Sequence, residues 1–187
     1  MSIKGRLCRG ILGLFGWKCR DIDNRPIRAV VIGYPHTSNW DFIVGILTMN
    51  ALDLNAKWAG KDSLFWGPMG WFMKWLGGIP VNRRDRTGLV SRLADQLRHL
   101  ERFNMIITPE GTRSYTEGWK TGFYRLALML DVPVLCGVID FEKKETGIIG
   151  CIKLSGNMES DLQDIAVIFE GTSGKFPHKA SPIRFLS

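Results

Sequence analysis

A histidine and an aspartate with four residues between them occur in the segment PHTSNWD, directly after a β-branched run. If Ser38 caps a helix that begins there, Asp41 takes the third helical position, and His36 can fold back against its carboxylate. A carboxylate that accepts from one imidazole nitrogen fixes the tautomer and leaves the other nitrogen as a base. The alternative is that Ser38 and Asp41 form only a capping box and that His36 is a loop residue. The spacing leaves both interpretations open.

A second polar group, PEGTRS at residues 109–114, follows another apolar run. Gly111 allows the backbone to approach a ligand closely, and Arg113 supplies a planar guanidinium suited to phosphate or carboxylate. The hydroxyls of Thr112 and Ser114 add hydrogen-bond donors. These residues predict an anion site, and a plain turn with a solvated arginine is the alternative.

A third polar group combines three arginines with one aspartate at residues 83–86. The arginines could hold phosphate, although charge clusters in loops are commonly just solvated. Of the remaining groups that could do chemistry, His99 and His178 are expected at the surface. Cys136 and Cys151 lie in predicted strands, so we expect them to be core residues and not nucleophiles.

The elements that must position these groups alternate along the chain. Short β-branched runs alternate with longer segments of 3.6-residue period, which predicts an α/β fold with a mostly parallel sheet flanked by helices. The predicted strands are 27–33, 56–60, 78–83, 104–108, 132–139 and 148–154, and the predicted helices are 39–50, 89–100, 119–130 and 162–169. Pro80 cannot donate to a ladder, which favours an edge position for the strand that contains it. Each polar group follows a strand, where open α/β sheets bind ligands.

The chain has 187 residues, 45% of them hydrophobic, with a net charge of +7 and a pI near 9.4. This length and composition predict one domain, residues 1–187, with a sizeable core. The positive charge favours phosphates, anionic lipids or nucleic acids as partners. Four cysteines without CxxC spacing and three histidines indicate neither a metal site nor a disulfide framework. No apolar run has the length of a spanning helix and none resembles a signal peptide, so we expect a cytoplasmic protein.

Two segments suggest contact with a membrane surface. The first, a basic amphipathic start over residues 1–25, has five basic and no acidic residues among its first twenty. The second, Leu64–Leu76, contains three tryptophans. Aromatic side chains beside basic ones suit an anionic bilayer surface, and the aromatic segment could also line a groove for an acyl chain. The alternative is that both segments are ordinary core. Residues 171–187 form an irregular tail rich in Gly, Ser, Pro and Lys.

The polar groups together resemble the motif blocks of the glycerolipid acyltransferase family, which includes the lysophosphatidic acid acyltransferases. HTSNWD at residues 36–41 looks like the H-x-S-x-x-D block, and residues 77–83 resemble the G-x5-R block. PEGTRS matches the third block, and VPV at residues 132–134 resembles the fourth. The blocks occur in the family's order, and the resemblance covers residues 27–139. Pro35, Pro80 and Asn82 differ from the residues common in the family, so the identity of the acceptor stays open.

The resemblance implies a single glycerol-3-phosphate acyltransferase-like domain. It also implies that His36 is the general base, that Asp41 orients it, and that Arg83 and Arg113 bind the acceptor's phosphate. The remaining residues assigned to the substrate-binding third block are Glu110, Gly111 and Thr112. The implied reaction is attack of a hydroxyl of a lysophosphatidic acid-like acceptor on an acyl thioester, without a covalent acyl-enzyme. The donor is acyl-CoA or acyl-acyl carrier protein, with no metal and no other cofactor.

The implied setting is phospholipid biosynthesis, by a cytoplasmic protein held peripherally on the inner face of the cell membrane. Three alternatives are open. The first is an acyltransferase with a non-glycerolipid acceptor, and the second is a catalytically silent lipid- or membrane-binding protein on the same fold. The third is a nucleic-acid-binding domain, which only the pI suggests. Because no RRM, KH or helix-turn-helix signature is present, we do not expect a nucleic-acid partner.

Overall fold

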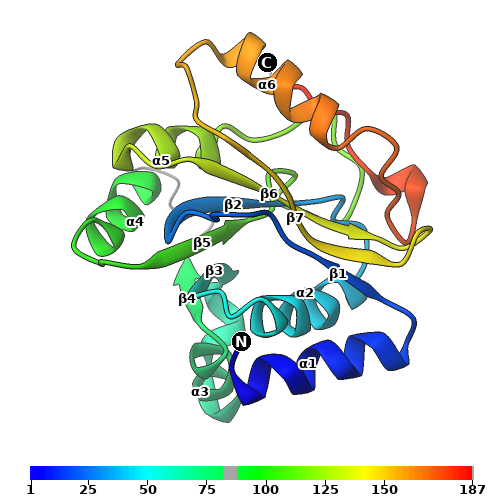
Figure 1. Ribbon diagram of the computed structural model, residues 1–187. Helices are drawn as coiled ribbons and strands as arrows, with labels where there is room; N and C mark the ends of the chain where they lie inside the picture. The colour runs from blue at the N-terminus through cyan, green and yellow to red at the C-terminus, as the bar shows by residue number, and fades with distance from the viewer. Residues whose placement is uncertain (82–87, 187) are drawn as a thin grey trace.

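Seven strands form one sheet in a computed structural model that describes residues 1–81 and 88–186 (Figure 1). The strand order is β1-β7-β6-β2-β5-β3-β4, and every neighbouring pair is parallel except β6 and β7. The strands are β1 (Lys18–Arg20), β2 (Arg28–Tyr34), β3 (Ala56–Lys61), β4 (Gly78–Val81), β5 (Phe103–Ile107), β6 (Val134–Asp140) and β7 (Glu145–Ile152). The predicted α/β class with a mostly parallel sheet is confirmed. Strand β4, which carries Pro80, lies at the sheet edge as expected.

Helices cover both faces of the sheet. They are α1 (Ile3–Leu14), α2 (Trp40–Ala51), α3 (Gly67–Trp75), α4 (Leu89–Arg98), α5 (Gly122–Leu130) and α6 (Met158–Ile168), with 3-10 turns η1 (Asp62–Phe65) and η2 (Pro177–Lys179). Helices α4, α5 and α6 lie over one face, and α2 lies over the other with α1 packed outside it (Figure 1). The chain therefore builds a three-layer sandwich, with α1 as an added outer helix on one side.

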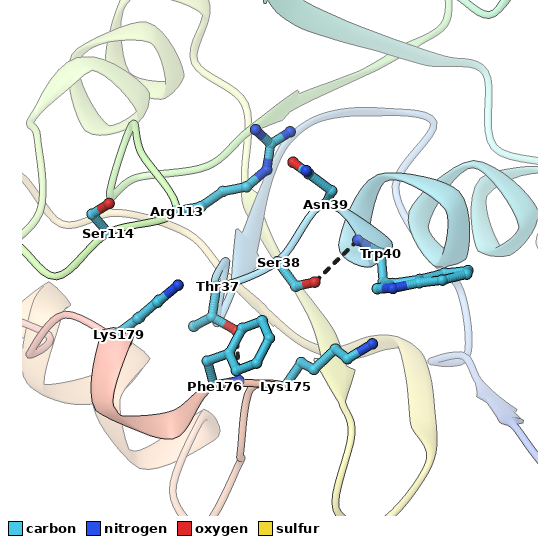
Figure 2. A pocket seen from close by; sticks show the side chains of 9 residues that line it. All are labelled: Thr37, Ser38, Asn39, Trp40, Arg113, Ser114, Lys175, Phe176 and Lys179. Atoms are coloured by element: carbon cyan, nitrogen blue, oxygen red, sulfur yellow. Dashed lines mark hydrogen bonds between the residues drawn. The ribbon is translucent and has the colours of Figure 1, made fainter.

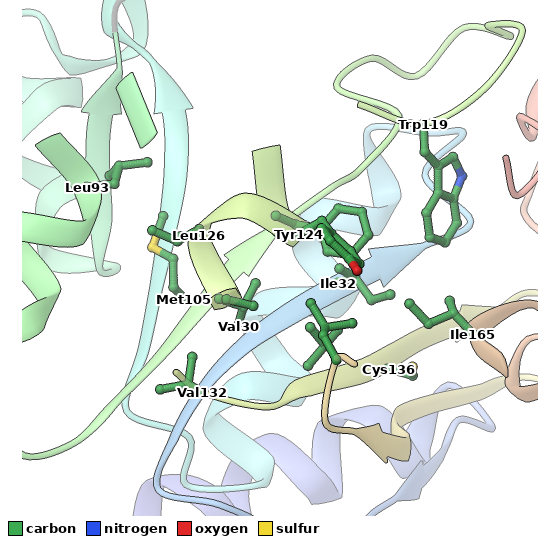
Figure 3. Close-up of a cluster of buried hydrophobic side chains, with 14 of the residues drawn as sticks. Val30, Ile32, Leu93, Met105, Trp119, Tyr124, Leu126, Val132, Cys136 and Ile165 are labelled. Atoms are coloured by element: carbon green, nitrogen blue, oxygen red, sulfur yellow. The ribbon is translucent and has the colours of Figure 1, made fainter. Parts of the chain in front are cut away.

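The main core lies under α4, α5 and α6. Val30 and Ile32 of the central strand β2 belong to this core, whereas Ala29 and Val31 face the opposite layer (Figure 3). Because β2 is buried on both faces, its sequence is a nearly continuous apolar run, as is typical of strands inside parallel sheets. The central strand is thereby held firmly, and the loop that follows it starts from a rigid base.

The structure differs from the predicted elements in several places. Helices α1 and α3 and the short strand β1 are not among the predicted elements, and β7 starts before the predicted strand and runs antiparallel to β6. The predicted helix over 119–130 begins only at Gly122. The reason is that the carbonyl of Trp119, which would accept a hydrogen bond within a helix, instead accepts from the N–H of Leu186 at 3.0 Å, so this backbone is engaged with the tail.

The topology brings two of the predicted functional loops together. Strands β2 and β5 are parallel neighbours, with Ile32 opposite Ile107, so they end at the same edge of the sheet. The loop after β2 carries the HTSNWD segment, and the loop after β5 carries PEGTRS. Their starting points therefore lie side by side. The Arg83 cluster, which follows β4, lies outside the described residues.

The tail is irregular, as predicted, but it is packed against the rest of the molecule. Ser181 is fully buried, and its carbonyl accepts from the Tyr34 hydroxyl at 3.1 Å. Phe185 pairs with Trp119 in an isolated parallel bridge. The tail therefore lies against the loops at the carboxyl ends of the strands.

Candidate active site

His36 and Asp41 are in contact. The Nδ1 atom of His36 lies 3.1 Å from Oδ2 of Asp41, and the side chains are 17% and 2% exposed. The same Asp41 oxygen accepts from the N–H groups of Thr37, at 2.7 Å, and Ser38, at 2.9 Å. Helix α2 begins at Trp40, whose N–H donates to the Ser38 hydroxyl at 3.2 Å. The cap residue is Asn39, which makes no side-chain cap hydrogen bond, so the prediction that Ser38 caps the helix is wrong. Ser38 and Asp41 nevertheless bond to the backbone at the helix start, so these hydrogen bonds and the His36–Asp41 contact occur together and are not alternatives.

This arrangement leaves one imidazole nitrogen for chemistry. With Nδ1 held by the carboxylate, Nε2 is the nitrogen that can accept a proton. The backbone N–H donors on Asp41 fix the carboxylate, and the carboxylate in turn fixes the imidazole ring. The other Asp41 oxygen, Oδ1, is buried and makes no hydrogen bond within the described part of the chain. The geometry is that of a general base with an orienting acid.

Glu110 joins three segments of the chain. Its Oε2 accepts from the N–H of His36 at 2.7 Å, and its Oε1 accepts from the N–H of Ser181 at 2.9 Å. Burial raises the pKa of Glu110, and the hydrogen bonds from Ser181 and His36 act in the opposite direction. The carboxyl therefore positions the loop that carries His36 against both the PEGTRS turn and the tail.

Glycine is required in the PEGTRS turn. Gly111 has φ +68°, and a Cβ there would lie 2.6 Å from Nζ of Lys120. Together with Thr112 and Glu110, it lies away from the lining of the two described cavities, so the geometry favours a role in shaping the turn. Arg113, by contrast, is exposed and lines both cavities.

An apolar cavity of about 660 Å³ lies between α2 and the sheet. His36 and Arg113 line it, and most of the remaining wall is apolar. The principal apolar contributors are Val31, Phe42, Ile43, Ile46, Met49, Trp58, Ile106, Val138 and Ile148. On α2, Gly45 faces the cavity, and a Cβ there would be 3.8 Å from Ile139. The missing side chain of Gly45 therefore leaves space at this part of the cavity wall.

The aromatic segment contributes little to this cavity. Of its residues, Leu64 and Met73 line the wall, whereas Trp66, Trp71 and Trp75 are 85%, 74% and 61% exposed. The three tryptophans therefore do not line this cavity, and the alternative that they are ordinary core residues is wrong for them. Side chains of α2 and the sheet form most of the wall instead.

A second cavity, of about 400 Å³, is cationic (Figure 2). Its charged side chains are Arg113 from the PEGTRS turn and Lys175 and Lys179 from the tail. The remaining lining residues are Thr37, Ser38, Asn39, Trp40, Ser114 and Phe176. Asn39 and Arg113 line both cavities, so the cationic pocket and the apolar cavity adjoin beside His36. Lys175 and Lys179 were not among the binding residues predicted from the sequence. The only indication of them in the sequence is the basic composition of the tail.

The amino-terminal helix has one buried and one exposed face. Cys8 and Leu12 pack into a cluster with Val44 and Ala51 of α2, whereas other apolar side chains of this region are exposed. The exposed ones are Ile3, Leu7, Leu14 and Phe15. The helix also adjoins α3, because Nζ of Lys4 lies 5.2 Å above the Trp75 ring. In the described residues no helix has the length and apolar character needed to cross a membrane.

Other reactive groups lie outside this site. Burial raises the pKa of the Cys136 thiol to about 12, so it is an inert core residue, as predicted. The same prediction is wrong for Cys151, which lies near the end of β7 with an exposed side chain. Within residues 1–81 and 88–186, no three His, Cys, Asp or Glu side chains are grouped so that they could hold a metal ion.

Comparisons with known proteins concern the family and the fold of the chain. A family model described as Acyltransferase matches residues 17–140. Among solved structures, the crystal structure of the 1-acyl-sn-glycerophosphate (LPA) acyltransferase PlsC from Thermotoga maritima is similar, with a TM-score of 0.60 and 19% identity. The match covers 88% of this chain and 74% of that one. A search among curated proteins finds no match.

Proposed function

Since the chain belongs to the acyltransferase family, we propose that it acylates a lysophosphatidate-like acceptor. In this reaction a fatty acyl group moves from acyl-CoA or acyl-acyl carrier protein to an acceptor hydroxyl. One observation carries the proposal, namely that His36, held by Asp41, lies where an apolar cavity adjoins a cationic pocket. A fatty acyl chain and a phosphate are the two chemistries that these cavities suit. The corresponding setting is phospholipid biosynthesis.

The proposed reaction uses His36 as a general base. Nε2 takes the proton of the acceptor hydroxyl while its oxygen attacks the thioester carbonyl. The tetrahedral intermediate collapses, the carbon–sulfur bond breaks, and the imidazolium returns the proton to the leaving thiolate. The negative charge of Asp41 stabilises the imidazolium while it exists. No covalent acyl-enzyme is needed, because the thioester is already activated.

The apolar cavity is the proposed site for the acyl chain. Its volume of about 660 Å³ falls within the range of small-molecule sites, roughly 300–1,000 Å³. Its wall also contains the buried hydroxyls of Thr48 and Thr146, which hydrogen-bond to each other at 2.8 Å. The two hydroxyls also lie within hydrogen-bond distance of the carbonyls of Val44 and Val138, at 2.8 Å and 3.1 Å. Because both hydroxyls have partners within the protein, the cavity presents a largely apolar surface to a hydrocarbon chain.

Phosphate recognition is assigned to Arg113, with Arg83 as the second arginine that the family resemblance implies. Arg113 lies beside the apolar cavity and lines the cationic pocket. A guanidinium can bind phosphate through two parallel hydrogen bonds. Arg113 is therefore suited to place the acceptor's headgroup near His36.

We also propose that the enzyme works on the inner face of the cell membrane. The exposed apolar residues of α1 and α3 lie beside basic side chains, as the approach of Lys4 to Trp75 illustrates. Such a surface suits peripheral attachment to an anionic leaflet, where each basic residue contributes about 1 kcal/mol. Attachment of this kind gives access to lipid acceptors without a membrane-spanning helix.

The central experiment measures acyl transfer by the purified protein. Palmitoyl-CoA and palmitoyl-acyl carrier protein are each supplied with 1-acylglycerol 3-phosphate, and thiol release and lipid product are followed together. His36→Ala should lower kcat by about 10²–10⁴, the usual contribution of a general base. The matched control is His99→Ala, because His99 is exposed and outside the lining of either cavity. Absence of transfer with both donors would contradict the proposal, and so would wild-type kcat in a folded His36→Ala protein.

A further inference from the structure

Three cationic side chains from distant parts of the chain meet in the cationic pocket. Arg113 comes from the turn after β5, and Lys175 and Lys179 come from the tail. Figure 2 shows these long side chains arranged around Thr37 and Ser38. None of the lining residues is acidic, and within the described residues none of the three cations forms an ion pair with a carboxylate. Like charges gathered without a counter-charge favour the binding of an anion.

The tail is anchored so that its lysines stay at this pocket. The N–H of Phe176 donates to the hydroxyl of Thr37 at 3.2 Å, and Glu110 accepts from the N–H of Ser181. Gly174 packs so closely that a Cβ there would lie 2.7 Å from the Thr37 hydroxyl. These contacts tie the tail to the same loop that carries His36.

Aromatic rings hold the two lysine side chains. Nζ of Lys175 lies 4.9 Å from the centre of the Trp40 ring, and Nζ of Lys179 lies 4.7 Å from that of Phe176. An ammonium group over an aromatic face keeps its N–H donors for a further partner. The two ammonium groups are therefore available to an anion in the pocket.

The place of the pocket indicates which anion it suits. It adjoins the apolar cavity at Asn39 and Arg113, so one ligand can have an anionic group in the pocket and a reacting group near His36. The hydroxyls of Ser38 and Ser114 and the amide of Asn39 supply uncharged partners in addition to the cations. A tetrahedral anion with several oxygens uses such a set of donors better than a carboxylate does.

We propose that Lys175 and Lys179 of the tail, together with Arg113, bind a phosphomonoester group of a substrate. Both lysines lie beyond residue 140, where the match to the family model ends. The inference rests on the proposed function, because it assigns residues to a substrate of that reaction. Two substrates carry such a phosphate: the lysophosphatidate acceptor, and CoA in its nucleotide part.

The test replaces each lysine by glutamine, which keeps the Cβ and Cγ methylene groups and removes the charge. KM is measured for 1-acylglycerol 3-phosphate, for monoacylglycerol, for acyl-CoA and for acyl-pantetheine. We expect Lys175→Gln and Lys179→Gln each to raise KM for a phosphate-bearing substrate about tenfold, since a hydrogen bond to a charged group is lost. The control is Lys153→Gln, because Lys153 is exposed and paired with Asp131 at 3.3 Å. The variants Lys175→Arg and Lys179→Arg should recover most of the affinity.

The substrate pairs identify the source of the phosphate. A rise in KM for 1-acylglycerol 3-phosphate but not for monoacylglycerol supports the inference with the acceptor as the source. A rise for acyl-CoA but not for acyl-pantetheine supports it with CoA as the source. Unchanged KM values, or equal rises with the phosphate-free substrates, overturn it.

A binding measurement keeps this inference separate from the proposed reaction. Calorimetric titration with a short-chain 1-acylglycerol 3-phosphate, and separately with CoA, needs no turnover. If the wild-type protein is inactive but binds one of these ligands and the glutamine variants bind it at least tenfold more weakly, the pocket assignment stands without the acyltransferase assignment. If the wild-type protein is active and the variants bind both ligands as it does, the pocket assignment fails alone.

Discussion

Replacing Asp41 by asparagine should separate the two tasks of this side chain. One oxygen of Asp41 holds the loop through the N–H groups of Thr37 and Ser38, and the same oxygen contacts His36. An asparagine carbonyl can take this position and keep both backbone hydrogen bonds. Its amide group then occupies the place of Oδ1, which is buried and makes no hydrogen bond to the described residues. The substitution thus removes the charge and keeps the geometry.

The expected loss of activity follows from the charge alone. A hydrogen bond to a charged group contributes about 1.5–3 kcal/mol, against about 0.5–1.5 for a neutral one. The difference of about 1–2 kcal/mol corresponds to a fall in kcat of roughly 5–30-fold. A larger loss through the wrong imidazole tautomer is not expected, because the two backbone donors keep the carbonyl, and not the amide, facing His36. Asp41→Ala should instead leave two backbone donors without their acceptor, at about 1–3 kcal/mol of stability for each one that stays buried.

The chain offers a closely matched control in Asp140. This aspartate is also 2% exposed and accepts two backbone N–H groups through one oxygen, from Glu142 at 3.0 Å and Lys143 at 2.9 Å. It lines neither described cavity. Thermal unfolding should show similar changes in stability for Asp41→Asn and Asp140→Asn. Thiol-release kinetics should show a fall in kcat for Asp41→Asn alone. Equal kcat values in the two variants would refute the role of the Asp41 charge.

Three further predictions address the acyl cavity, Glu110 and the membrane surface. In Gly45→Leu the added side chain should extend into the apolar cavity, so the enzyme should prefer acyl-CoA with shorter chains. The measurement is kcat/KM against acyl chain length, and Gly10→Leu on the exposed side of α1 should leave this preference unchanged. Because burial raises the pKa of Glu110, its contribution to stability is greatest at acid pH and is lost as the pH rises through the raised pKa. In Glu110→Gln one carboxylate oxygen that accepts a hydrogen bond is replaced by an amide group, so the free energy of unfolding should fall. The free energy of unfolding should also depend less on pH than in the wild type, as measured by denaturant titrations between about pH 4 and 8. Trp71→Ser should reduce the fraction of protein that sediments with phosphatidylglycerol vesicles. The control is Leu128→Ser, because Leu128 is an exposed residue of α5, and an equal reduction in this variant would refute a specific membrane surface.

The local features of the candidate site could be predicted from the sequence. The His36–Asp41 contact joins residues five positions apart at the start of a helix, so short-range geometry determines it. The edge position of β4 follows from the missing N–H of Pro80. The α/β class follows from the alternation of strand and helix periods. In each case the physical cause acts over a few neighbouring residues.

The enclosing features of the site were decided by tertiary structure. The apolar cavity lies between α2 and the sheet, and Gly45 of α2 is one of the residues that line it. No local sequence pattern indicates which glycine of the chain lines a cavity. The cationic pocket needs the tail, more than sixty residues along the chain from Arg113, to fold back beside it. Glu110 has an ordinary turn position in the sequence, yet its two oxygens bond segments 74 residues before it and 71 residues after it. Such contacts join residues that are far apart in the sequence. Many residues with the same local propensity could make each contact, and only the packing of the complete fold determines which of them does.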